Sequence, residues 1–176
     1  MRIVLVSLLL LLPLAACGDS ASENDAAKAA AVFYDISLSE RTGGVPVGDF
    51  RTRLRGSISP MLDSLIAQAG EAERRHAVRT GNSEPPYLQG DVFSSLFEGA
   101  TAYEIGKCEA DDATVTCDVL LVHDAPEQPV QWTDRVVLVA ADGRWAVDDI
   151  VYGGDWDFAP KGTLQQLLRG VIALEE

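Results

Sequence analysis

The fold of this 176-residue chain is decided by the segment Val130-Gln-Trp-Thr-Asp-Arg-Val-Val-Leu-Val-Ala-Ala-Asp-Gly-Arg-Trp-Ala-Val-Asp-Asp-Ile-Val-Tyr152. Its apolar residues recur with a period of two, which is typical of strands that bury one face. Asp142-Gly143 in the middle is a strong signal for a two-residue hairpin turn. The segment therefore predicts two antiparallel strands, near residues 129–140 and 144–152.

A second hairpin precedes this one, with strands expected near residues 100–109 and 114–123. If Asp112-Ala113 is the tip of its turn, Cys108 faces Cys117 across the two strands. The same register pairs Lys107 with Asp118, Ile105 with Leu120 and Tyr103 with Val122. We therefore expect a disulfide between Cys108 and Cys117 rather than two free thiols. Its role would be structural, because neither cysteine belongs to a C-x-x-C redox motif.

Helical periodicity flanks these strands. The sequence predicts helices over residues 26–38, 49–55, 59–78, 92–98 and 163–170, the fourth capped by Asp91 and the last opened by a capping box. Helices followed by an antiparallel meander indicate an α+β fold. We expect N-terminal helices packed on a curved four-stranded antiparallel sheet, with a short C-terminal helix.

The N-terminus carries an export signal. The chain begins Met-Arg and is almost wholly apolar over residues 3–16, too short a run for the roughly 20 residues of a membrane span. Leu14-Ala15-Ala16-Cys17 resembles a bacterial lipobox, which implies that residues 1–16 are a signal peptide and that Cys17 is lipidated. The alternative is an ordinary secretory signal with a cysteine near its cleavage site. Stable anchoring by lipid takes more than one acyl chain.

Charge and composition narrow the class of protein. Removal of residues 1–16 takes one basic residue, Arg2, from the 14 present, which leaves 13 against 27 acidic residues and a net charge of −14. Such a surface repels phosphate backbones, so we expect no nucleic-acid partner. Residues 17–25 read as the lipidated cysteine and a polar tether, and residues 26–176 as a single α+β domain. The domain would face the periplasm from the inner or the outer membrane.

Three segments together resemble a known family: Pro86-Tyr-Leu-Gln-Gly-Asp-Val-Phe-Ser-Ser-Leu-Phe-Glu98, Trp145-Ala-Val-Asp-Asp-Ile-Val-Tyr-Gly-Gly154 and Lys161-Gly-Thr-Leu164. They are similar to an uncharacterised family of proteobacterial envelope lipoproteins. That domain of unknown function resembles the cone-shaped α+β folds of nuclear transport factor two and ketosteroid isomerase. The resemblance implies a fold, and it brings no established catalytic residues.

The candidate catalytic residue is Asp149. With Asp142-Gly143 as the turn, Arg135 pairs with Ile150, within diagonal reach of Asp148. Asp149 then falls on the other face, among apolar residues that include Val136, and a carboxylate there must be paired, hydrogen-bonded or protonated. In pocket-forming relatives of this fold such an acid can act as a general base. The favoured alternative is that Asp149 accepts backbone N–H groups of the loop over residues 152–158.

The same loop supplies the candidate binding residues, which are Tyr152, Asp155, Trp156 and Asp157. The sequence predicts no metal site and no cofactor. We expect a non-catalytic binding or protein-interaction module of the cell envelope. Its partners would be the membrane, through the N-terminal lipid, and an envelope protein or a small ligand. Two alternatives remain open, an isomerase- or hydrolase-like enzyme with an acidic pocket and an immunity-type inhibitor of a toxin or envelope hydrolase.

Overall fold

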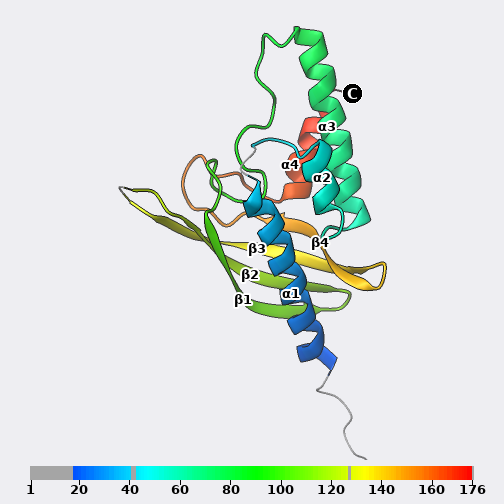
Figure 1. Cartoon of the computed structure of the whole chain (residues 1–176), viewed down its shortest axis with the longest axis vertical. Helices are drawn as coiled ribbons and strands as arrows, with labels where there is room; N and C mark the ends of the chain where they lie inside the picture. The colour runs from blue at the N-terminus through cyan, green and yellow to red at the C-terminus, as the bar shows by residue number, and fades with distance from the viewer. Residues whose placement is uncertain (1–17, 41–42, 127, 176) are drawn as a thin grey trace, which may run out of the picture.

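A computed structural model describes residues 18–40, 43–126 and 128–175. The predicted α+β fold is confirmed, with four helices and one four-stranded antiparallel sheet among these residues (Figure 1). In chain order the elements are α1 (Gly18–Ser39), α2 (Gly48–Leu54), α3 (Pro60–Thr80), β1 (Ala102–Asp111), β2 (Thr114–His123), β3 (Val130–Ala141), β4 (Arg144–Val151) and α4 (Leu164–Ala173).

The sheet is a meander in the order β1-β2-β3-β4, and α1 lies across one of its faces (Figure 1). We call this covered face the inner face. Small and aromatic side chains of α1, among them Ala30 and Phe33, pack there against alternate residues of the strands. The buried inner-face residues of β2 to β4 are Val115, Cys117, Val119, Leu121, Trp132, Asp134, Val136, Leu138, Val147 and Ile150.

The free edge of β4 is covered by two short backbone pairings. Ser59 N donates to Val147 O at 2.8 Å, and Tyr152 N donates to Gly162 O at 3.1 Å. The two helices that start next to these pairings, α3 and α4, pack against each other. Their predicted caps are confirmed, since Ser59 Oγ accepts the Leu62 N–H and Thr163 forms a capping box.

The β1–β2 register agrees with prediction only near the turn. Cys108 pairs with Cys117, and the predicted disulfide is present. Beyond it a β-bulge at residues 106–107 shifts the register by one. Two predicted pairs farther from the turn are therefore wrong, because Ile105 lies opposite Val119 and Tyr103 lies opposite Leu121. Lys107 lies in the bulge and forms its ion pair with Glu109, and the charge of Asp118 also acts on it.

The β3–β4 hairpin contains a bulge of the same kind. Leu138 pairs with Val147, but Val137 pairs with Asp149, so Asp148 is an extra residue in β4. The predicted pairing of Arg135 with Ile150 is wrong, because Arg135 pairs with Val151. The face predicted for Asp149 is wrong for the same reason. Asp149 lies on the outer face of the sheet, since its neighbour Ile150 is buried on the inner face.

Tertiary contacts explain this second bulge. One carboxylate oxygen of Asp148 accepts the Ser59 hydroxyl at 2.5 Å, and the other accepts Gln165 Nε2 at 2.9 Å. These bonds tie Asp148 to the starts of α3 and α4 rather than to Arg135. The extra residue therefore joins two helices to the edge of the sheet.

One helix begins earlier than expected, and one predicted helix is not formed. Residues 18–25 form the first turns of α1 instead of an extended tether, and Glu23 Oε1 accepts the Ala110 N–H at 3.3 Å next to the β1–β2 turn. Residues 92–98 form bends and a turn instead of a helix, because Asp91 N donates to Phe97 O at 2.8 Å and closes a loop. None of the described helices has the length and apolar character to cross a membrane. The predicted signal peptide and Cys17 lie outside the described residues.

Candidate functional site

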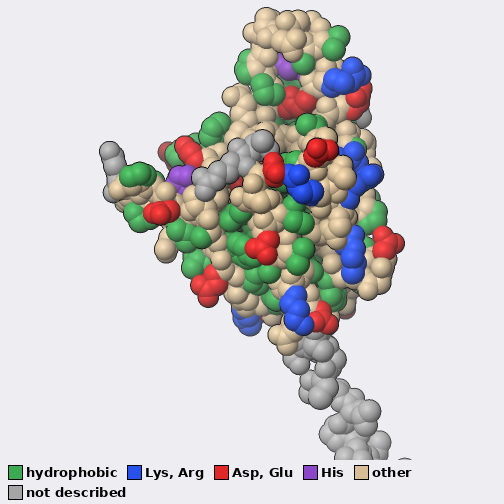
Figure 2. Space-filling model, viewed as in Figure 1, with side chains coloured by type: hydrophobic (Ala, Val, Ile, Leu, Met, Phe, Trp, Pro, Cys, Tyr) green, Lys and Arg blue, Asp and Glu red, His purple; other side chains and the backbone are tan. Residues whose placement is uncertain are grey.

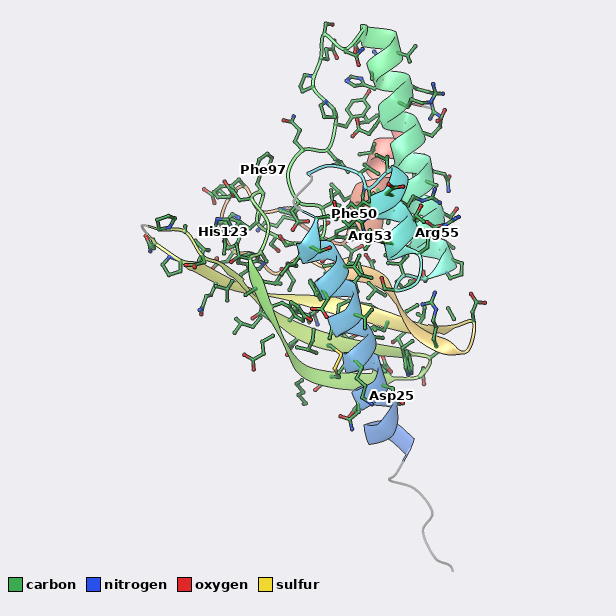
Figure 3. The ribbon with its side chains drawn as sticks, viewed as in Figure 1. Asp25, Phe50, Arg53, Arg55, Phe97 and His123 are labelled. Atoms are coloured by element: carbon green, nitrogen blue, oxygen red, sulfur yellow. A yellow bond between two sulfur atoms is a disulfide. The ribbon has the colours of Figure 1, made fainter. Side chains whose placement is uncertain are left out.

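The sheet has two ends with different contents. The β1–β2 and β3–β4 turns and the start of α1 lie at one end, which we call the proximal end. Residues 91–101 and 152–159 lie at the other, the distal end, where His123 Nδ1 contacts Gly99 O at 2.7 Å. Figure 3 shows this separation, with Asp25 near one end of the sheet and Phe97 and His123 near the other.

A buried carboxylate holds the distal end together. Asp134 on β3 is fully buried and accepts four hydrogen bonds. The donors are Ser95 N at 2.8 Å, Ser95 Oγ at 2.5 Å, Gly153 N at 2.8 Å and Trp132 Nε1 at 3.1 Å. The sequence analysis missed Asp134, although the alternation Trp132-Thr-Asp134-Arg-Val136 places it on the inner face. Asp134 thereby joins Ser95 to Gly153, two residues that are far apart in the chain.

The loop that follows β4 contains the sequence-predicted binding residues. Tyr152 is buried, and its hydroxyl donates to Val92 O at 2.7 Å. Trp156 is half-buried and packs edge to face on Trp132, with ring centroids 5.7 Å apart. Asp155 and Asp157 are exposed. The backbone of this loop is held by Asp134 and by Ser95 Oγ, which accepts the N–H groups of residues 153 and 154.

Asp149 has a different set of neighbours from those expected. Its Oδ1 accepts the N–H groups of Ile150 and Gln165, each at 2.9 Å, and Gln165 lies in the first turn of α4. A carboxylate at that position is stabilised by the helix dipole. The side chain of Asp149 thus contacts the start of α4, where Asp148 also contacts Gln165. Among the described residues, Asp149 accepts no hydrogen bond from the loop over residues 152–158. A catalytic role for Asp149 stays a prediction.

A cavity of about 260 Å³ opens at the distal end. It lies between the end of α1, the start of α2 and residues 90–100. Its described lining includes three aromatic rings and three carboxylates, and none of the described lining residues is Lys or Arg. They are Ser37, Leu38, Glu40, Gly43, Gly44, Phe50, Gly90, Asp91, Val92, Phe93, Phe97, Glu98, Gly99 and Ala100. We call this space the distal cavity.

Asp91 supplies the most buried carboxyl group of the distal cavity. Its Oδ1 accepts the Phe93 N–H at 2.8 Å. Burial raises the pKa of this carboxyl group, and the charge of Asp134 raises it further, while hydrogen bonds from the Phe93 N–H and the Ser94 side chain oppose the rise. Gly99, at φ +76°, is packed against it, since an added Cβ would lie 2.8 Å from Asp91 Oδ2. The sequence analysis treated Asp91 only as a helix cap.

Behind this carboxyl group lies a buried tyrosine. The hydroxyl of Tyr34, on α1, has no hydrogen-bond partner in the described part of the chain. Burial raises the pKa of Tyr34, and the charges of Asp134 and Asp91 raise it further. Besides burial, the charges of Asp91 and Asp134 thus act on two buried tyrosines, Tyr34 and Tyr152, and raise the pKa of both. No group of three or more His, Cys, Asp or Glu side chains arranged to hold a metal is found in the parts of the chain described.

Comparison with known proteins adds one relative. No protein-family model matches the chain, and no solved structure matches it either. The chain is similar to the uncharacterized lipoprotein YbjP of Escherichia coli (strain K12), with 23% identity over 137 residues that span 78% of this chain and 71% of YbjP. This similarity fits an envelope lipoprotein of unknown function.

Proposed function

We propose that this chain is a lipoprotein of the bacterial envelope that binds a ligand in the distal cavity and catalyses no reaction on it. The observation that carries the proposal is the cavity of about 260 Å³ with the buried carboxyl group of Asp91 in its wall. A concave space with a small number of convergent polar groups is a common form of a small-molecule site.

The envelope location rests on the sequence and on the relative. The lipobox-like Leu14-Ala15-Ala16-Cys17 and the similarity to a lipoprotein support lipidation of Cys17 after removal of residues 1–16. The domain would then face the periplasm. Helices that cover one face of a curved sheet and leave a cavity also support kinship with the cone-shaped folds of nuclear transport factor two.

Binding without catalysis follows from the groups present in the wall. Nucleophilic catalysis uses a nucleophile within hydrogen-bond reach of a base that activates it. Among the described lining residues the candidate groups are three carboxylates and the Ser37 hydroxyl, and Ser37 donates to Tyr34 O at 3.2 Å. This set suits recognition of a ligand better than chemistry on it.

The test is to fill the cavity. Ala100 lines it, whereas Ala140 is exposed on β3 near the proximal end, so Ala100→Phe blocks the cavity and Ala140→Phe is the matched control. The wild type and both variants are extracted from cell membranes with detergent and compared by native mass spectrometry. We expect a bound small molecule in the wild type and in Ala140→Phe, and its loss in Ala100→Phe. The same ligand content in all three proteins, including none, would contradict the proposal.

A protein partner is the second candidate function, favoured by exposed aromatic rings. Phe97 is 54% and Phe158 is 72% exposed, and both lie in distal-end segments. Exposed aromatic side chains are enriched at protein interfaces. A photo-crosslinking amino acid at Phe158 should capture one recurrent envelope protein, and the same probe at the exposed Val78 of α3 should not.

A further inference from the structure

The first step toward the ligand is the charge of the distal cavity. The described lining contains the carboxylates of Glu40, Asp91 and Glu98 and no basic side chain. Glu40 is paired with Arg53, whereas Asp91 has a second carboxylate, Asp134, as a neighbour. Most Lys and Arg side chains visible in Figure 2 lie on the α2 and α3 side of the molecule. The described part of the lining therefore carries net negative charge, which suits a cation.

The second step is the arrangement of aromatic rings. Phe50 and Phe93 meet edge to face in the wall, with centroids 6.3 Å apart. Phe97 is exposed at the rim, and its ring is seated on Gly90, where an added Cβ would lie 2.6 Å from Phe97 Cδ2. Gly90 thus leaves room for an aromatic ring in a cavity whose wall also contains the Asp91 carboxyl group. Aromatic rings combined with negative charge are the usual means of recognising organic ammonium groups.

The volume of the distal cavity limits the size of its ligand. Sites for drug-sized ligands occupy about 300–1,000 Å³, and the distal cavity measures about 260 Å³. The space therefore suits a small molecule better than a peptide. The position of the Asp91 carboxyl in the wall and of Phe97 at the rim places charge and aromatic ring on one ligand-sized volume.

We propose that the distal cavity binds a small organic ammonium ion, with the cation held between the Asp91 carboxylate and the Phe97 ring. This inference rests on the proposed function, since it names the class of ligand for the same cavity. It predicts that charge, and not shape alone, decides which molecules bind.

The experiment compares a cation with its neutral isostere. Choline and 3,3-dimethylbutan-1-ol have the same shape, and only choline carries the charge. Each is titrated into the ¹⁵N-labelled mature chain carrying Cys17→Ser, and backbone amide shifts are followed by NMR. We expect choline to shift the amides of Gly90, Phe93 and Gly99, with the alcohol binding at least tenfold more weakly.

Variants locate the interaction. Asp91→Asn should weaken choline binding at least tenfold, and Phe97→Leu, which keeps an apolar side chain, should weaken it severalfold. Asp118→Asn is the matched control, because it removes one carboxylate from an exposed position on β2. Equal affinity for choline and the alcohol, or equal effects of Asp91→Asn and Asp118→Asn, would overturn the inference.

A measurement on the unsubstituted side chain covers the case in which Asp91→Asn does not fold. The carboxyl carbon of Asp91 is titrated with pH, with and without choline. A bound cation stabilises the carboxylate, so choline should lower the pKa of Asp91. An unchanged pKa at saturating choline would overturn the inference. If the alcohol binds as well as choline while Ala100→Phe still loses its ligand, the ammonium proposal fails and the proposed function stands. If the ligand content also stays unchanged, both fail.

Discussion

Two aspartates of the distal end, Asp134 and Asp91, differ in how many hydrogen-bond donors compensate their buried charge. Asp134 accepts four hydrogen bonds, so its charge is compensated by donors from three parts of the chain. For Asp91 two donors, Phe93 N and the Ser94 side chain, are set against burial and against the charge of Asp134. Buried charge without full compensation costs stability. We therefore interpret Asp134 as a structural residue and Asp91 as one retained for binding.

Asp134→Ala should destabilise the domain strongly. It leaves the buried donors Ser95 N, Ser95 Oγ and Trp132 Nε1 without their acceptor, and each such group costs about 1–3 kcal/mol. We expect a loss of at least 3 kcal/mol in the free energy of unfolding, measured by urea denaturation. Asp118→Asn, at an exposed site, should change it by less than about 0.5 kcal/mol. A similar small effect for Asp134→Ala would contradict the structural assignment.

Asp91→Asn should have a pH-dependent effect on stability. Burial raises the pKa of Asp91 above its unfolded value, so the contribution of this group is present at low pH and is lost as pH rises through the folded pKa. Asparagine does not ionise. The variant should therefore gain stability over the wild type as pH rises from 4 to 7, by about 1.4 kcal/mol for each unit of pKa shift. Urea denaturation at several pH values measures the difference, and a difference that does not vary with pH would argue against a buried carboxyl group.

At the scale of elements, the hairpins show what the sequence could and could not predict. The turns and the cysteine pair follow from local signals, Asp142-Gly143 and the spacing of Cys108 and Cys117. Each register slips by one beyond its bulge. The bulge at Asp148 depends on contacts with Ser59 and Gln165, which are 89 and 17 positions away in the chain. Alternation along one strand carries no information about such distant partners.

The candidate site shows the same division. Asp134 could have been found from its inward position in an alternating strand, and the caps of α3 and α4 were found from their residue types. The distal cavity could not, because it forms where the end of α1 meets residues 90–100. Asp91 looks like a helix cap in sequence and becomes a cavity residue only through that packing.

The disulfide should stabilise the β1–β2 hairpin measurably. It links residues nine positions apart, and a closed loop of that length is worth about 2–3 kcal/mol in the chain-entropy estimate. The double variant Cys108→Ala/Cys117→Ala should lose about that much in the free energy of unfolding. Cys117 is fully buried, so its replacement should also cost packing in the core. A reducing agent should lower the stability of the wild type and leave the variant unchanged. Equal sensitivity of both proteins would contradict this prediction.

At the scale of the whole molecule, the position of α1 fixes how a lipidated chain would sit on a membrane. A helix of 22 residues is about 33 Å long, and it begins one residue after Cys17. Its start lies near the proximal end and its last turns line the distal cavity (Figure 1). The cavity would therefore open away from the bilayer, toward ligands dissolved in the periplasm.

Energy transfer to the membrane tests this orientation. A dye is attached at Ala113→Cys in the β1–β2 turn or at Asp155→Cys in the distal loop, both exposed, and the acceptor is a labelled lipid in vesicles that carry the protein on a lipid at Cys17. Transfer should be clearly stronger from position 113. Equal transfer, or stronger transfer from position 155, would show that the domain lies in another orientation.

The packing of α1 across the sheet also has a mechanical consequence. Tension applied at the N-terminus would act along the axis of α1, whose buried side chains Ala26, Ala30, Phe33 and Tyr34 are distributed along its length. The force then acts on all these contacts at once, as shear, and does not separate them one after another. Forced unfolding depends on the barrier to unfolding rather than on equilibrium stability. The element nearest the anchor is thus the one through which drag on a membrane-held domain would reach its hydrophobic core.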